Sequence, residues 1–284
     1  MIHPSVPLAA LGAVLTGAAL HAAWNVGIRG GADRRMATVG VLTGAGLIGA
    51  VVLPFLPAPA PASWPHLAIS ALMHLLYYYL IAEAYQAGAV SLAYPVMRGT
   101  APALTATVAS LGFGERLGLH GWGGLLAISG GVILLARARG EPGARRAIRF
   151  ALANAVVIAI YTLNDGFGAR LSGAPVAYAL WTFVLPAIPS ALILFRFRLS
   201  RFVALAEPRA IARGLGGGGC SVASYALALW AMTQAPIGEI AALRETSMLF
   251  GVLFAWWFLG ERPRARGLIA VVMIAAGAAM VELG

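Results

Sequence analysis

The chain contains no lysine, and all 20 of its basic residues are arginine. A nucleotide-binding P-loop needs a lysine that reaches the phosphates, so this chain contains no P-loop ATPase. The same absence excludes a Schiff base between a lysine and retinal or pyridoxal phosphate. Chemistry that depends on a lysine amine is therefore excluded.

Cysteine is almost as scarce, because Cys220 is the only one. A single cysteine excludes a disulfide within the chain and any metal site built from several cysteines. The sequence also lacks the His-Glu-x-x-His and Gly-x-Ser-x-Gly motifs of metalloproteases and serine hydrolases. We therefore expect no metal, no other cofactor and no enzymatic activity. An intramembrane enzyme such as a lipid-modifying transferase stays a weaker alternative. Such an enzyme needs acid–base groups or metal ligands close together, whereas the acidic residues of this chain are spread thinly along the sequence.

Charge is the third scarcity, since only 11% of the 284 residues are charged and 60% are hydrophobic. Soluble chains carry about 25% charged residues. The mean hydropathy is +0.84, and apolar runs of about 20 residues match the length of a helix that crosses a bilayer. These features predict an all-α integral membrane protein.

The N-terminal apolar run has no arginine before Arg29, so it lacks the basic start of a signal peptide and is expected to be a retained helix. The formal net charge is +10, which in a soluble domain would indicate a nucleic-acid partner. Here the arginines gather in short breaks between apolar runs, which is typical of a topology signal. No nucleic-acid partner is expected.

Nine breaks separate the apolar runs and predict ten transmembrane helices. The breaks fall at 30–34, 57–65, 88–91, 114–121, 137–149, 170–175, 196–208, 234–238 and 261–266. Sixteen arginines lie in or beside the odd-numbered breaks, whereas the even-numbered breaks hold only Arg116 and Arg170. The positive-inside rule then predicts an inner (plasma) membrane protein with odd breaks in the cytoplasm and both termini outside.

A repeat at an offset of 146 residues relates the two halves of the chain. It pairs Arg98 with Arg244, Thr100 with Thr246, Gly114-Glu115-Arg116 with Gly260-Glu261-Arg262, and Gly121, Ile128 and Gly131 with Gly267, Ile274 and Gly277. At an offset of 139, Asn25 pairs with Asn164. Each unit holds five helices, residues 1–140 and 141–284, and an odd number of spans forces the second unit to be inverted.

Two five-helix repeats, each with the pattern LGE-R…G…I…G, resemble the EamA branch of the drug/metabolite transporter superfamily. The aromatic-rich segment LLYYYLIAEAYQAGAVSLAYPVMRGTAP looks most like the bacterial aromatic amino-acid exporters. The resemblance implies a central cavity lined by helices 1, 3, 4, 6, 8 and 9, with helices 5 and 10 toward the outside.

Polar residues inside membrane helices are costly and are expected to face a cavity or a partner. Arg98 and Arg244 either meet a substrate carboxylate or form structural ion pairs, Arg98 with Glu83 and Arg244 with a nearby glutamate. Asn25 and Asn164 either bind a ligand or join helices.

Aromatic and histidine side chains complete the predicted substrate site. They are Trp24, His74, Tyr77, Tyr78, Tyr94, Tyr161 and Tyr225. Tyr77, Tyr78 and Tyr79 cannot all face one way at 100° per residue, so at least one faces lipid or another helix. Candidates for proton coupling are His21, Glu83 and Asp165, and His21 and His74 are expected to be the only histidines within helices.

The sequence therefore predicts a secondary transporter that works by alternating access through a midplane cavity and exports amino acids, including aromatic ones. The alternatives are a carrier of drugs or nucleotide sugars, or a channel. The expected partners are small metabolites and the lipid bilayer. Because one chain holds both repeats, we expect it to act as a monomer.

Overall fold

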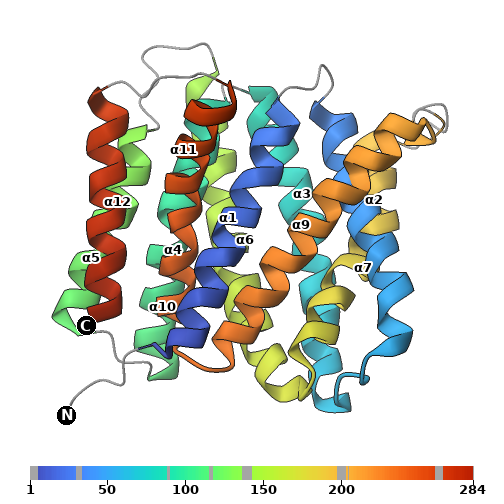
Figure 1. Cartoon of the computed structure of the whole chain (residues 1–284), viewed down its shortest axis with the longest axis horizontal. Coiled ribbons are helices and arrows are strands. Elements are labelled where there is room, and N and C mark those ends of the chain that lie inside the picture. The colour runs from blue at the N-terminus through green and yellow to red at the C-terminus, as the bar shows by residue number, and fades with distance from the viewer. Residues whose placement is uncertain are drawn as a thin grey trace.

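The computed structural model describes residues 6–29, 34–87, 90–114, 118–135, 143–196, 203, 205–259 and 265–283. Within these ranges the chain folds into ten helices, counting α10, η3 and α11 as one broken helix, besides the short 3₁₀ turns η1 and η2 (Figure 1). The elements are α1 (Leu8–Arg29), α2 (Arg34–Val52), η1 (Leu53–Phe55), η2 (Pro61–Ser63), α3 (Trp64–Ala87), α4 (Val90–Phe113), α5 (Leu119–Leu135), α6 (Ala144–Ser172), α7 (Pro175–Phe195), α9 (Pro208–Met232), α10 (Ile237–Leu243), η3 (Arg244–Thr246), α11 (Ser247–Leu259) and α12 (Ala265–Leu283). The predicted all-α fold is confirmed.

The outer surface of the bundle is apolar, as a lipid environment requires. Large apolar side chains such as Leu119 and Trp257 are 87% and 76% exposed. So much exposed apolar surface would be unfavourable in water. Among the described residues, five helices are long and apolar enough to cross a membrane: Met36–Phe55, Pro61–Ala84, Ala144–Ser172, Pro175–Phe195 and Pro208–Met232. The chain is a multi-pass membrane protein.

Helix ends fall at the predicted breaks, with one correction. Gly143 before α6 and Gly173 after it have left-handed backbone, with φ of 82° and 62°, which glycine adopts without a steric penalty. His120 was predicted to lie in the break 114–121 and His66 directly after the break 57–65, but α5 begins at Leu119 and α3 at Trp64, so both histidines are helical. The prediction that only His21 and His74 are helical is therefore wrong, because Pro65 is compatible with the first turn of a helix.

The arginine-rich helix ends lie together. Helices α1, α3, α5, α7 and α11 end, and their successors begin, at the upper end of the bundle in Figure 1. Arg29, Arg34, Arg146 and Arg209 belong to these ends. At the opposite end, Arg170 is a structural cap, because it donates hydrogen bonds to the carbonyls of Met232 (2.7 Å) and Ala235 (2.8 Å) after α9. The predicted charge asymmetry is present, and which end faces the cytoplasm stays a prediction.

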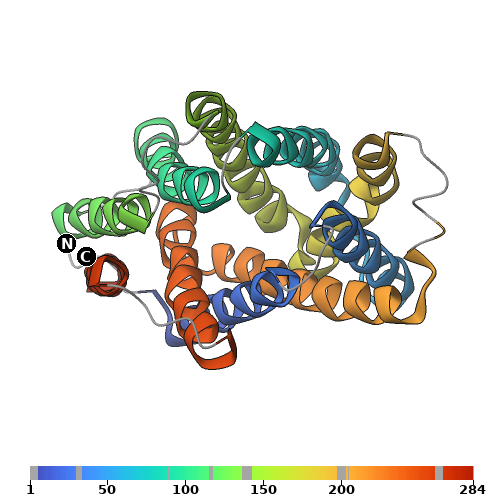
Figure 2. The same cartoon turned by 90° about the horizontal axis from the view of Figure 1, so that it is seen from above.

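The packing partners reveal the inverted repeat. Helix α1 packs against α9 and α11, and its counterpart α6 packs against α3 and α4, the counterparts of those two helices. Helix α2 packs against α7 at one end of the bundle seen from above, and α5 packs against α12 at the other (Figure 2). Equivalent helices thus make equivalent contacts, which is the packing expected of two inverted five-helix units. The predicted unit boundary, between residues 140 and 141, lies outside the described residues.

The repeat-related glycines lie at the contact between α5 and α12. A Cβ atom on Gly131 would be 2.9 Å from the carbonyl oxygen of Ala270, and one on Gly277 would be 2.5 Å from that of Gly124. Ala270 is the counterpart of Gly124 at the offset of 146, so the two contacts are equivalent. The second half of the predicted motif therefore serves helix packing. Of the Gly-Glu-Arg turns, Glu115, Arg116 and residues 260–262 lie outside the described residues.

A second glycine contact joins the halves where α2 crosses α9. Each helix carries a Gly-x-x-x-Gly spacing, Gly40 to Gly44 and Gly214 to Gly218. A Cβ atom on Gly44 would be 2.2 Å from the carbonyl oxygen of Gly214, and one on Gly218 would be 2.4 Å from the backbone nitrogen of Ala45. Small residues let membrane helices approach closely where apolar burial offers no driving force.

Candidate functional site

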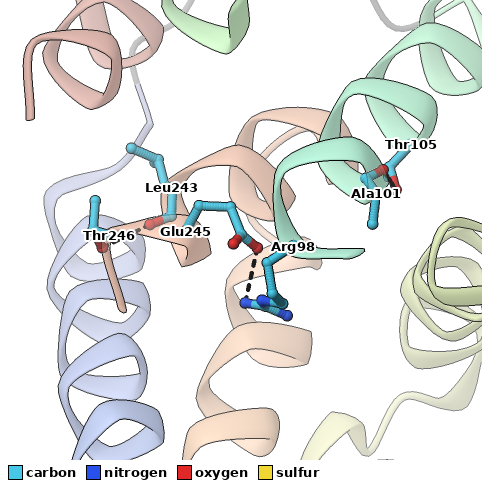
Figure 3. Close-up of polar contacts among 6 residues, drawn as sticks. All are labelled: Arg98, Ala101, Thr105, Leu243, Glu245 and Thr246. Carbon is cyan, nitrogen blue, oxygen red and sulfur yellow. Dashed lines mark hydrogen bonds and ion pairs between the residues drawn. The ribbon is translucent and has the colours of Figure 1, made fainter. Parts of the chain in front are cut away.

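A buried ion pair joins the two halves near the centre of the bundle. The Nη2 atom of Arg98 on α4 lies 2.8 Å from Oε1 of Glu245 in η3, and Figure 3 shows the two side chains pointing toward each other. The expected pairing of Arg98 with Glu83 does not form. Glu83 lies near the end of α3 and pairs instead with Arg146 at 3.3 Å, away from this centre.

The ninth span breaks at this pair. A 3₁₀ turn, η3, separates α10 from α11 and carries both Arg244 and Glu245. The Thr246 hydroxyl donates to the carbonyl of Leu243 at 2.7 Å (Figure 3), a local bond of the kind that competes with regular helix. The counterpart of this broken span in the first repeat is α4, which runs unbroken through Arg98. Discontinuous helices are where membrane transporters expose backbone and side-chain groups to substrate.

Arg244 differs from its repeat partner Arg98. Its guanidinium lies over the ring of Tyr225, 5.2 Å from the centroid, and no ion pair to a carboxylate is found for it within the described residues. The position equivalent to Glu245 in the first repeat is Gly99. Of the two predicted cations, Arg98 is therefore neutralised by a carboxylate, and Arg244 is held against an aromatic ring.

Asp165 on α6 is the centre of a buried hydrogen-bond network. Its carboxylate is fully buried and accepts four hydrogen bonds from side chains of α3, α6, α7 and α9. The donors are Ser70 (3.0 Å), Asn164 (3.1 Å), Tyr178 (3.2 Å) and Tyr225 (2.6 Å). Four donors match the acceptor capacity of a carboxylate, which makes a buried charge tolerable.

His74 connects this network to an aromatic cluster. Its Nδ1 atom lies 3.2 Å from the Ser70 hydroxyl, and its ring centroid lies 4.6 Å from that of Tyr161 and 6.2 Å from that of Tyr225. Tyr77 approaches Tyr161 at 6.0 Å. These distances and mostly edge-on geometries are those of favourable aromatic pairs. The structure thus brings four of the predicted aromatic and histidine side chains together.

His21 and Trp24 form a further aromatic contact, on α1. Their rings meet edge to face at 5.4 Å, and both Arg98 and Arg244 are close enough to act electrostatically on His21. Within the described part of the chain, the buried Trp24 Nε1 atom has no hydrogen-bond partner, nor have Glu245 Oε2 and Ser247 Oγ. Buried polar atoms are nearly always paired in native proteins, so these three are candidates to bind a polar ligand.

The remaining predicted residues lie elsewhere or are engaged in packing. Asn164 joins α6 to α3, because its Nδ2 donates to the carbonyl of His66 at 2.8 Å and its Oδ1 lies 3.0 Å from His66 Nδ1. Tyr78 packs against side chains of α2 and α7, and its ring also lies 5.1 Å from that of Tyr77 at the edge of the aromatic cluster. Tyr79 is exposed, as expected for at least one of the three tyrosines. Asn25 and Tyr94 are in α1 and α4, and their side chains lie outside the described residues.

Three residues of this centre were not predicted from the sequence. Ser70 and Tyr178 donate to Asp165, and Glu245 pairs with Arg98. Ser70 stands four residues before His74, a spacing that places both on one helix face, so the serine was within reach of sequence reasoning. Tyr178 carried no signal beyond being a tyrosine in an apolar helix.

A ten-helix bundle with inverted halves and polar groups buried where they meet has the architecture of a secondary transporter. Residues 145–283, the second repeat, match the EamA-like transporter family. Among the solved structures that match, one crystal structure has a TM-score of 0.72 and 23% sequence identity over 97% of each chain, a likeness that concerns the fold. No curated protein matches.

Proposed function

We propose that the whole chain is an EamA-like secondary transporter of small molecules and that its substrates are amino acids, including aromatic ones. The observation that carries the substrate class is Arg244. It is a guanidinium at a break in a central helix, it has no carboxylate partner among the described residues, and its face is occupied by an aromatic ring. Such a group binds a substrate carboxylate through paired N–H donors.

The surrounding side chains suit the rest of such a substrate. Tyr77, Tyr161 and Tyr225 offer ring faces and edges to an aromatic or apolar side chain, and aromatic faces attract an ammonium group. The Trp24 indole N–H is an additional donor for the carboxylate. We assign Arg98 a supporting role, because its charge is already balanced by Glu245.

Transport would proceed by rocking of the two inverted halves around this centre. Opening the centre on either side changes the contacts between α1, η3 and α4, since these elements meet there from different halves. His21 and Asp165 are the coupling candidates next to the proposed substrate, whereas Glu83 is at the bundle end. Export from the cell follows from the family resemblance of the aromatic-rich helices.

The test is counterflow in proteoliposomes preloaded with unlabelled amino acids, with labelled phenylalanine outside. Saturable uptake that is stimulated by internal substrate supports a carrier. A linear flux without counterflow indicates a channel instead. If no amino acid supports counterflow while nucleotide sugars or cationic drugs do, the transporter assignment stands and the substrate class is wrong.

A further inference from the structure

An open groove lies between α3 and α6, near the end of α3 and the start of α6. It has a volume of about 400 Å³ and is lined by Leu80, Arg146, Arg149, Phe150 and Ala153. The two arginines that line it lie near the start of α6, whereas Asp165 of the central network lies near the end of that helix. Nothing in the transport mechanism uses it.

The groove carries a net positive charge. Arg146 pairs with Glu83 at 3.3 Å, yet its side chain is 63% exposed, and its guanidinium lies 5.5 Å from the Phe150 ring centroid. Arg149 is exposed and forms no ion pair within the described residues. This end of the groove thus holds two guanidinium groups and one carboxylate, and a second anion would be attracted.

An apolar strip continues from the arginines toward the middle of the bundle. Helices α3 and α6 run antiparallel, since Gly143 contacts Ala87 at one end and Ser70 bonds Asp165 further along. Toward the start of α3 and the end of α6, both helices carry exposed apolar side chains beyond the groove. They are Ile69 and Leu76 on α3 and Val156 and Ile160 on α6.

The depth of the two arginines in a bilayer follows from the length of α6. Its 29 residues correspond to about 43 Å at 1.5 Å per residue, longer than the roughly 30 Å hydrocarbon layer. Arg146 and Arg149 lie in its first two turns. They therefore stand at the level of lipid headgroups, with the apolar strip at the level of acyl chains.

We propose that this groove binds one anionic glycerophospholipid. The phosphate accepts hydrogen bonds from Arg146 and Arg149, which a guanidinium donates as a paired fork. One acyl chain lies along Leu76, Val156 and Ile160. Basic pockets between membrane helices are recognised sites for anionic headgroups, and here the charge and the apolar strip are continuous.

The experiment measures lipid retention by the purified protein in detergent, by native mass spectrometry after addition of phosphatidylglycerol or phosphatidylcholine. We expect the wild type to retain phosphatidylglycerol preferentially. Each arginine near a lipid surface contributes enough to change retention about fivefold, so Arg146→Gln with Arg149→Gln should remove most of the preference. Glu83→Gln should increase retention, because it removes the competing carboxylate.

Arg145→Gln is the matched control, because Arg145 is an exposed neighbour that does not line the groove. If it lowers retention as much as the double variant, the effect is diffuse charge and the site is wrong. Equal retention of both lipids by the wild type would also overturn the proposal. If soluble glycerol phosphate displaces the lipid at equal concentration, the groove is a free-anion site and the acyl strip plays no part. Unchanged thermal unfolding of the variants shows that their fold is intact.

Discussion

Gly99 and Glu245 occupy equivalent positions in the two repeats, yet they face different neighbours. A Cβ atom on Gly99 would lie 3.1 Å from the carbonyl oxygen of Ser129 on α5, whereas Glu245 reaches across to Arg98 on α4. The 3₁₀ turn at Arg244–Thr246 accounts for the difference, because it changes the direction of side chains relative to a regular helix. The local break gives a symmetric scaffold an asymmetric centre.

The first prediction concerns Arg244. Replacing it with glutamine removes the charged donor while keeping length and polarity. Hydrogen bonds to charged groups contribute about 1.5–3 kcal/mol, so the KM for amino acids should rise about 10- to 100-fold. Concentration-dependent counterflow measures this. Arg213→Gln, which removes an exposed arginine near the start of α9, is the control and should leave the KM unchanged. Equal effects of both variants would contradict the assignment.

The second prediction concerns the ion pair. Glu245→Gln leaves Arg98 buried beside a neutral amide, and breaking a buried pair costs about 3–5 kcal/mol. We expect a clear decrease in the thermal unfolding midpoint in detergent, followed by scanning fluorimetry. The double variant Arg98→Met with Glu245→Leu should recover most of the stability, since no unpaired charge remains. A double variant as unstable as the single one would show that the pair is not the cause.

The third prediction separates the two roles of Tyr225. Tyr225→Phe removes the hydroxyl that donates to Asp165 at 2.6 Å and keeps the ring beneath Arg244. It should lower stability by about 1–3 kcal/mol because a buried acceptor loses a donor, with a small change in KM. Tyr225→Leu removes the ring as well and should also raise the KM. Unfolding and counterflow measured on both variants distinguish these roles, and an equal KM for the two would exclude a role of the ring.

The fourth prediction compares two glycines of the same helix crossing. An alanine at Gly44 would place its Cβ 2.2 Å from the Gly214 carbonyl oxygen, whereas nothing lies within 4 Å of a Cβ at Gly216. Gly44→Ala should destabilise by about 1–3 kcal/mol through overpacking. Gly216→Ala should stabilise by about 0.5–1 kcal/mol through helix propensity. Opposite shifts of the unfolding midpoint are expected, and a Gly44→Ala variant at least as stable as the wild type would show that the α2–α9 contact is looser than described.

Much of the fold could be predicted from where arginine, glycine and proline interrupt apolar runs. Residues such as Arg29 and Pro175 mark the ends of apolar runs and so predict the helix breaks. The repeat is predicted by pairs at a fixed offset, such as Gly131 with Gly277. The reason for those glycines, an α5–α12 contact with no room for a side chain, required the structure. A fixed offset identifies equivalent residues but says nothing of what they touch.

The site was predictable in its residue types and only partly in its contacts. Burial cost identified Arg98, Arg244 and Asp165 as residues that need partners, and the structure supplies a partner for each. Arg98 pairs with Glu245 and not with Glu83 because of the 3₁₀ turn that carries Glu245. The helix propensities of Arg, Glu and Thr do not predict that turn. Partners that come from another helix are set by tertiary packing, and sequence spacing cannot reveal them.

The contact between α5 and α12 has a consequence for the history of the chain. Because Gly131 meets Ala270 while Gly277 meets Gly124, the surface is isologous: each helix presents the same patch to the other. A single five-helix ancestor inserted in both orientations would already carry both sides of this contact and would form a twofold homodimer. Fusion of two copies then removes the concentration dependence of assembly. It also allows equivalent positions to differ, as Gly99 and Glu245 do.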